Sequence, residues 1–145
     1  MAKDIFHDNV REAIRKEGWI VTAEQWRIDL EVTYLEVDLM AENLLIADKG
    51  GEKIAVEVKS FVQKSIIYTF HEAIGQYLDC QSALKEIDPN RIVFLALPIA
   101  AYNNEVFQGR FIQKRLREEN INLIVFDPIT NTVEKWIKQA NTAAH

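Results

Sequence analysis

The sequence has few of the residues that cross-link a chain or interrupt its regular structure: one cysteine, three prolines and five glycines among 145 residues. A lone cysteine, Cys80, excludes an internal disulfide and a cysteine metal cluster, so we expect a protein of the reducing cytoplasm. The low glycine and proline contents, with 48% hydrophobic residues, exclude collagen-like and disordered classes. No apolar run approaches the roughly 18 residues of a membrane span. The acid-containing N-terminus is not typical of a signal peptide, so no membrane association is expected.

Basic charge is also scarce. The chain carries 17 Lys and Arg against 22 Asp and Glu, a net charge of -5 at pH 7. This excludes a basic coat over the whole surface, so any contact with nucleic acid needs a local patch. The length suits one hydrophobic core, and no repeat, low-complexity tract or linker-like stretch divides it. We therefore expect a single domain over residues 1–145.

Hydrophobic spacing predicts three helices and a larger set of strands. The predicted helices cover residues 4–17, 65–87 and 104–119. The predicted strands begin at 19–21 and continue over 26–32, 34–40, 44–47, 53–60, 91–97, 121–126 and 133–137, with a hairpin-type turn at Lys49-Gly50-Gly51. This order predicts an α/β (α+β) fold. A mixed sheet, formed by a meander and then a parallel crossover, is flanked by helices.

Two details of these helices can be compared directly with a structure. Asp4 stands at the start of the first helix, where aspartate is a favoured N-cap residue. In the third helix we expect five apolar side chains to point inward: Val106, Phe107, Phe111, Ile112 and Leu116.

The most informative segment is the predicted strand Ile54-Ala55-Val56-Glu57-Val58-Lys59-Ser60. Because side chains alternate along a strand, Glu57 and Lys59 share one face about 6–7 Å apart, and Ala55 leaves space beside them. If the strand is central, burying these charges is costly without partners or a metal ion. The simpler alternative is a half-exposed strand whose charged face lies in water.

A second acid, Asp38, interrupts the preceding strand between Val37 and Leu39. We expect Asp38 on the face opposite these two neighbours, so that Asp38 and Glu57 point to one place. Two carboxylates, a backbone carbonyl and waters suit Mg²⁺, which prefers hard oxygen ligands. A neighbouring lysine, Lys59, would stabilise a phosphate or help to generate the attacking hydroxide.

Asp38, followed by Glu57-x-Lys59 on the next long strand and then by a helix, resembles the PD-(D/E)xK nuclease superfamily. The predicted elements over roughly residues 4–97 are similar to the αβββαβ core of these restriction-endonuclease-like proteins. The sequence departs from the superfamily pattern at Val37, where the motif has proline. The resemblance implies Asp38 and Glu57 as ligands of Mg²⁺ or Mn²⁺.

Two further residues fit the same resemblance. Gln76, within Gly75-Gln76-Tyr77, resembles the glutamine motif of RecB-type nucleases, and His7 stands where superfamily members place a Glu or His near the metal. The alternatives are a polar residue beside an apolar helix face for Gln76 and a helix-surface histidine for His7. The catalytic set that the resemblance implies is Lys59, Glu57, Asp38, Gln76 and His7.

Longer stretches of the chain are similar to one particular family, XisH, the fdxN element excision controlling factors. These stretches are MAKDIFHDNVREAIRKEGW at the start, EKIAVEVKSF at 52–61, FHEAIGQY at 70–77 and the ending IVFDP…VEKWI. The resemblance implies a cytoplasmic cyanobacterial protein linked to programmed DNA excision and DNA recombination, often paired with an XisI-type protein. The family description states control of excision and does not establish cleavage.

Other polar residues have simpler interpretations. His71 is more typical of a packed or surface histidine than of a catalytic one, and Cys80 of a small core residue. Glu36, on the face of Asp38, is either a supporting acid or a solvated side chain. Basic strips on the first and third helices are interleaved with glutamates, as on an ordinary solvated face.

Three functional classes remain open from the sequence. The first is a Mg²⁺-dependent endonuclease acting on DNA. The second is a catalytically silent accessory protein that binds DNA or an XisI-type partner and directs a separate site-specific recombinase. The third is an interaction module in which Trp26, Tyr68, Tyr102 and Trp136 anchor an interface. A homodimer is also expected by analogy, since the two strands of a duplex need two sites.

Overall fold

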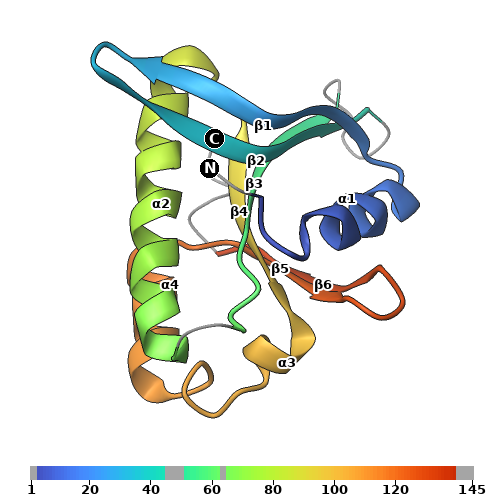
Figure 1. Cartoon of the computed structure of the whole chain (residues 1–145), viewed down its shortest axis with the longest axis vertical. Helices are drawn as coiled ribbons and strands as arrows, with labels where there is room; N and C mark the ends of the chain where they lie inside the picture. Colours follow the sequence, from blue (N-terminus) through green and yellow to red (C-terminus); the bar gives the residue numbers. More distant parts are fainter. Residues whose placement is uncertain (1–2, 45–50, 63–64, 140–145) are drawn as a thin grey trace.

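The computed structural model describes residues 3–44, 51–62 and 65–139, in which four helices and six strands follow one another. The helices are α1 (His7–Lys16), α2 (Ile66–Ile87), α3 (Ile99–Tyr102) and α4 (Arg110–Glu118). The strands are β1 (Ile20–Leu30), β2 (Thr33–Asn43), β3 (Glu52–Val58), β4 (Ile92–Pro98), β5 (Leu123–Asp127) and β6 (Thr132–Ile137) (Figure 1). No helix in the described ranges is long and apolar enough to cross a membrane.

All six strands form one sheet in the order β1-β2-β3-β4-β5-β6. The first three strands pair antiparallel, β3-β4 and β4-β5 pair parallel, and β5-β6 pair antiparallel. Parallel neighbours need a crossover connection, and α2 provides it between β3 and β4. The predicted mixed sheet flanked by helices is confirmed, including the αβββαβ order from α1 to β4.

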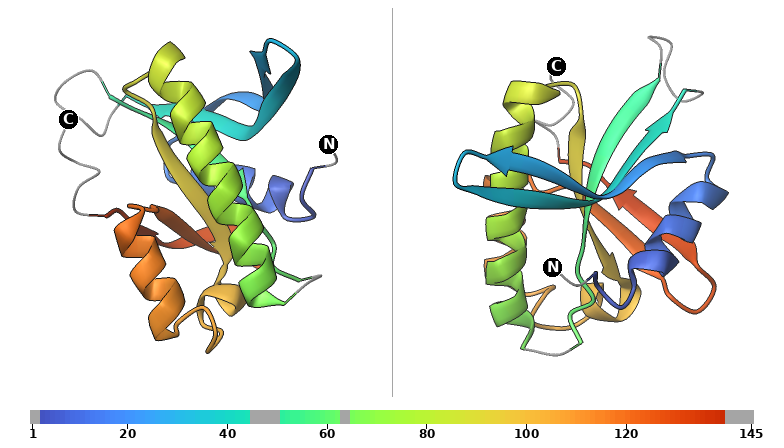
Figure 2. Two further views of the ribbon diagram at one scale, coloured as in Figure 1. Left: turned by 90° about the vertical axis from the view of Figure 1, so that its left-hand side faces the viewer. Right: turned by 45° about the horizontal axis from the view of Figure 1, so that its top comes forward.

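Helices cover both faces of the sheet, which is why the central strands are buried. Figure 2 shows α2 and α1 on opposite sides of the sheet, with α4 beside α2. On the α2 side, Phe70, Tyr77 and Leu116 belong to one apolar cluster, whereas Val10 and Ile14 of α1 belong to a second cluster on the other side. The paired β1-β2 ribbon extends beyond the rest of the sheet and over α2 (Figure 1).

Helix boundaries differ from the predicted ones where side chains take over backbone hydrogen bonds. The N-cap of α1 is Phe6, not Asp4, because Asp4 accepts hydrogen bonds from the N–H groups of Phe6 and Ser60 instead. Asp4 therefore joins the start of α1 to the segment that follows β3.

The predicted helix over 104–119 begins six residues late. Asn104 accepts a hydrogen bond from the N–H of Val106 at 2.8 Å, which is the turn that asparagine favours, and α4 starts only after Gly109. Phe107, Ile112 and Leu116 are buried as predicted. Val106 and Phe111 are exposed, so their predicted inward orientation was wrong.

The first strands also differ in their extents. Residues 19–21 and 26–32 were predicted as separate segments, and the structure joins most of them in β1. In the predicted strand 44–47, Leu44 lies in a turn, and residues 45–47 lie outside the described ranges, as do Lys49 and Gly50 of the predicted turn.

Candidate functional site

The candidate site is centred on the end of β3, where Glu57 faces α2 and lines a cavity with residues of that helix. Ala55, two residues earlier, belongs to the apolar cluster on that side, and Val56 and Val58 belong to the cluster under α1. The N–H of Lys59 donates to the carbonyl of Ala96 at 2.9 Å, so the parallel pairing with β4 continues past the end of β3. The predicted alternation of this strand is confirmed.

Asp38 of β2 contacts the backbone between these two residues. Its Oδ2 atom accepts a hydrogen bond of 2.7 Å from the N–H of Val58, which is the peptide group that joins Glu57 to Val58. The last register pair between β2 and β3 is Leu39 with Val56, so this N–H lies beyond the paired region. Asp38 thus takes the place of a backbone acceptor and brings its carboxylate beside Glu57.

The side-chain alternation of β2 breaks at Asp38. Val37 packs in the cluster under α2 and Leu39 in the cluster under α1, so the prediction that they share one face was wrong. The register pairs on either side of Asp38 leave Gln25 of β1 opposite it, and Gln25 has a left-handed φ of 47°. An irregular backbone at this point changes which side each following residue faces.

The two carboxyl groups influence each other. Burial and the adjacent Asp38 carboxylate together raise the pKa of Glu57 to about 8, against the opposing effect of the Lys59 ammonium. Burial also raises the pKa of Asp38, against the lowering effects of the Val58 N–H, His7 and Lys59. Glu57 is 6% exposed, and no hydrogen bond or ion pair reaches its carboxyl group from the described residues. A buried acid pair of this kind favours a bound cation.

A cavity of about 310 Å³ opens beside Glu57, between the β1-β2 ribbon and α2. Its lining residues are Thr33, Tyr34, Leu35, Glu36, Glu57, Gln76, Asp79 and Cys80. Gln76 lies one helical turn before Cys80 on α2, which places both on the same side of that helix. Asp38, Lys59 and His7 are outside this lining.

Gln76 supplies the observation that tests whether a metal fits here. Its Oε1 atom is buried and has no hydrogen-bond partner in the described part of the chain. An orphaned amide oxygen in the same cavity as a buried, unpaired Glu57 carboxyl group is a hard-oxygen donor set, which suits Mg²⁺ or Mn²⁺. The residues present therefore fit a divalent ion held by Asp38 and Glu57, with Gln76 as a supporting ligand.

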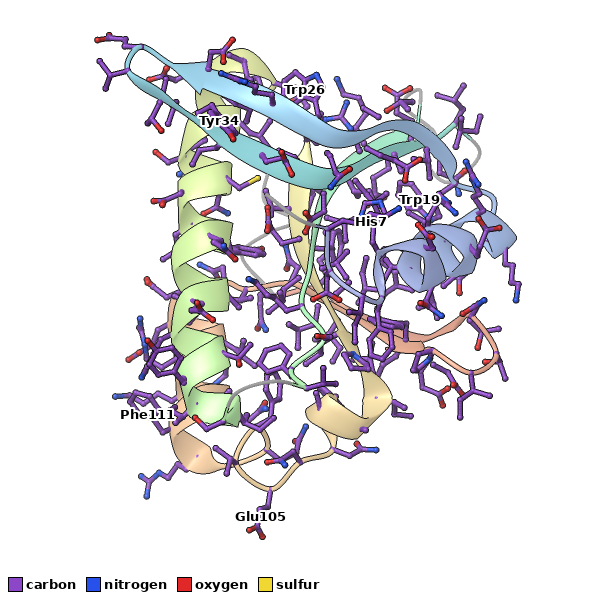
Figure 3. The ribbon with its side chains drawn as sticks, in the orientation of Figure 1. His7, Trp19, Trp26, Tyr34, Glu105 and Phe111 are labelled. Atoms are coloured by element: carbon purple, nitrogen blue, oxygen red, sulfur yellow. The ribbon has the colours of Figure 1, made fainter. Side chains whose placement is uncertain are left out.

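His7 reaches the site from the other side of the sheet. Its side chain is 1% exposed, its Nε2 donates to Oε1 of Glu24 at 2.8 Å, and its Nδ1 is buried without a partner among the described residues. Figure 3 shows His7 between α1 and the strands. A carboxylate on one ring nitrogen fixes the orientation of the other nitrogen. His7 acts electrostatically on Asp38, so it lies near that carboxylate.

A second group of possible ligands surrounds His7 but is better explained as an ion-pair cluster. Ligand atoms of His7, Asp8 and Glu24 lie within 4.8 Å of one another. Arg11 contacts both Asp8 and Glu24 at 3.1 Å, and Lys3 also contacts Asp8 at 3.1 Å. These two cations already neutralise the acids, so the cluster needs no metal.

Comparison with known proteins assigns the chain to a family. The family model of the XisH protein matches residues 1–134. This chain belongs to the XisH family. It is similar to the crystal structure of an XisH family protein from Nostoc punctiforme PCC 73102, with 34% sequence identity, a TM-score of 0.82, and coverage of 93% of this chain and 100% of that one.

A second solved structure is similar to the same extent. It is the fdxN element excision controlling factor protein from Anabaena variabilis, with 34% identity, a TM-score of 0.81, and coverage of 94% of this chain and 100% of that one. A search of curated proteins found no match. The predicted XisH membership is confirmed over nearly the full length.

Within this XisH protein, sequence reasoning missed or undervalued several residues near the site. Glu36 lines the cavity and raises the pKa of Glu57, although a solvated side chain was the favoured interpretation. Tyr34 also lines the cavity and was not considered. Glu24 is 17 residues from His7, so no local spacing could have revealed their contact.

The structure also tests the predictions for His71, Cys80 and the basic strip on the first helix. His71 is exposed, as predicted for a surface histidine. Cys80 is buried in the apolar cluster under α2, as predicted for a small core residue. On α1, Arg11 and Arg15 both pair with Glu12, at 3.1 and 3.0 Å. This part of the basic strip is therefore the neutralised, solvated face that the interleaved glutamates predicted.

Proposed function

We propose that this XisH protein controls the excision of a DNA element and carries a divalent-metal site for phosphodiester hydrolysis. The role in excision follows the description of the Anabaena variabilis relative as an fdxN element excision controlling factor. The observation that carries the metal site is the 2.7 Å hydrogen bond from the Val58 N–H to Asp38, which holds Asp38 against the backbone of Glu57.

In this proposal Asp38 and Glu57 hold Mg²⁺ or Mn²⁺. When held there, such an ion would supply Lewis-acid polarisation of a phosphoryl oxygen and would lower the pKa of a bound water. Gln76 adds a neutral oxygen that no protein donor occupies in the described chain. Glu57 must lose its proton to bind the ion, and the ion's charge offsets the burial and the Asp38 charge that raise its pKa.

Lys59 acts on the reacting phosphate. Its charge already acts on both Asp38 and Glu57, so it lies within electrostatic reach of the position where the phosphate would approach them. During hydrolysis a water oxygen forms a bond to phosphorus while a P–O ester bond breaks. Lys59 stabilises the charge that develops on the phosphate oxygens, and the departing oxygen takes up a proton. His7, held by Glu24, acts on Asp38 through its charge and lowers the pKa of that carboxyl group.

One observation favours a second candidate, a catalytically silent accessory protein. Three acids, Glu36, Glu57 and Asp79, line the cavity together with no basic residue, and the chain has a net charge of -5. Without a bound cation this surface repels phosphates. In that case the fold would serve an XisI-type partner or a separate recombinase, and the metal experiments below would find neither binding nor cleavage.

Cleavage of supercoiled and linear DNA with Mg²⁺ or Mn²⁺ tests the proposal. We expect Glu57→Gln and Lys59→Ala each to lower cleavage by at least about 100-fold, since charge-stabilising groups contribute about that much. Glu134→Gln is the matched control, because Glu134 is an exposed carboxylate on β6. Cleavage that survives both site substitutions would assign the activity to a contaminant or another site.

A further inference from the structure

We infer that the site takes single-stranded or locally unpaired DNA, one unstacked nucleotide at a time, and not an intact duplex. The inference rests on the proposed hydrolytic function and adds its substrate class. It is carried by the shape of the cavity beside Glu57, by the aromatic side chain in its lining, and by the free edge of β2.

The volume of the cavity suits one nucleotide and is too small to enclose a duplex. At about 310 Å³ it is at the small end of the roughly 300–1,000 Å³ range of ligand pockets. Glu57 is 6% exposed, in a lining that it shares with residues of β2 and α2. A B-form duplex is much wider, since its major groove alone spans about 12 Å. A nucleotide that enters this cavity beside Glu57 has therefore left its partner strand.

Tyr34 offers a surface for the base of such a nucleotide. It lines the cavity, is 39% exposed, and lies on the part of β2 that overhangs α2 (Figure 3). The guanidinium carbon of Arg27 lies 3.9 Å from the centre of the Tyr34 ring. Aromatic side chains that stack on bases, with arginine beside them, are the common means of holding single strands without sequence preference. Arg27 is also paired with Asp29 at 2.9 Å, which holds the guanidinium in place over the Tyr34 ring.

The backbone of β2 provides further contacts. β2 pairs with β3 only over Leu39–Asn43, so residues 33–38 have β1 on one edge and no strand from the described ranges on the other. Thr33, Tyr34, Leu35 and Glu36 all line the cavity, which places this unpaired edge along it. Backbone N–H and C=O groups on a free strand edge can pair with the hydrogen-bonding edge of an unstacked base.

The space beside Glu57 continues along the helix. A second cavity of about 360 Å³ between the ribbon and α2 shares Leu35 and Asp79 with the first. Its wall includes Leu30 and Ala83, which are apolar, and Glu86, which is acidic. The apolar part suits a second base, and the acids keep phosphates directed outward. The two cavities form a groove for a short stretch of single strand.

Fluorescence anisotropy with labelled oligonucleotides tests this inference. The probes are a 12-nucleotide single strand and the blunt duplex of the same sequence, in Ca²⁺ so that binding is measured apart from hydrolysis. We expect the single strand to bind more tightly than the duplex. Tyr34→Leu should weaken single-strand binding by about tenfold, and Tyr34→Phe should keep it within about twofold of wild type. Tyr68→Leu is the matched control, because Tyr68 is an exposed tyrosine on α2 outside the cavity lining.

The possible results distinguish the inferred preference for single strands from the proposed hydrolytic function. Equal affinity for duplex and single strand, or no loss in Tyr34→Leu, would overturn the inference even if Glu57→Gln abolishes cleavage. Tyr34-dependent binding of single strands without cleavage in any metal would support the inference and reject hydrolysis. If cleavage occurs, we expect a 3′-overhang or a bubble to be cut at least about tenfold faster than the blunt duplex in wild type, and this preference to shrink in Tyr34→Leu. A blunt duplex cut as fast as the bubble would overturn the inference.

Discussion

Asp38 and Val58 are joined by a 2.7 Å hydrogen bond at the point where β2 and β3 stop pairing. The contact satisfies a backbone N–H that no strand reaches, and it also fixes the Asp38 carboxylate beside Glu57. One hydrogen bond therefore serves both the stability of the sheet and the geometry of the site.

This double role predicts different effects for two substitutions of Asp38. Asp38→Ala leaves the Val58 N–H without its acceptor and should lower the free energy of unfolding by about 1–3 kcal/mol. Asp38→Asn keeps an acceptor and removes the charge, so it should retain most of the stability and lose Mg²⁺ affinity. Urea unfolding and calorimetric Mg²⁺ titration measure the two effects. Equal destabilisation by both variants would contradict the assigned role of the hydrogen bond.

The raised pKa of Glu57 predicts a pH-dependent stability in the absence of metal. Its pKa in the folded protein is about 8, against an ordinary value of 4.5. Between these values the folded state holds a proton that the unfolded state has lost, so the contribution of Glu57 to stability is full below about pH 4.5 and decreases as the pH rises through 8. We expect urea midpoints measured in EDTA to decrease over this window in wild type.

Glu57→Gln is the comparison for this pH profile, because glutamine has a similar shape and no titratable proton. Its midpoint should fall less than that of wild type between pH 5 and 8, about the window that the two pKa values define. Mg²⁺ binding by wild type should strengthen with pH over the same window, since the ion competes with the proton. Parallel profiles of the two proteins would show that Glu57 does not titrate there.

We expect the substitution Gln76→Leu to raise the stability of the metal-free protein and to weaken metal binding. Its buried Oε1 atom lacks a hydrogen-bond partner in the described chain, which is a cost that Gln76→Leu removes. We expect this variant to be equally stable or more stable than wild type by up to about 2 kcal/mol without metal. Its Mg²⁺ affinity, measured by calorimetry, should fall. A variant that unfolds more easily and binds Mg²⁺ normally would remove Gln76 from the site.

We expect the Cys80 thiol to react slowly, although Cys80 lines the cavity. Burial raises the pKa of its thiol to about 12, so the reactive thiolate is scarce at neutral pH. We expect slow modification by an alkylating reagent at pH 7 and fast modification only after unfolding. Cys80→Ala should keep the Mg²⁺ affinity, since Cys80 is not among the oxygen ligands. Rapid alkylation of the folded protein would contradict this assignment.

Much of the fold follows from local patterns. The long amphipathic helix over 65–87 and the continuously apolar strands near 91–97 and 121–126 were predicted within one or two residues, because spacing of 3.6 or 2 residues is set by the backbone itself. The start of α4 was missed because the hydrogen bond that the Asn104 side chain accepts from the Val106 N–H competes with helix formation there.

The sequence by itself determined the element order, the family and the alternation of side chains from Ile54 to Val58, since these depend on residues that are close along the chain. The tertiary structure decided what those residues can do. The irregular β2 at Asp38, the burial that raises the pKa of Glu57, the orphaned oxygen of Gln76 and the contact of His7 with Glu24 all arise between distant segments. Burial and electrostatic coupling depend on which segments pack together, and the spacing of residues along the sequence does not show that packing.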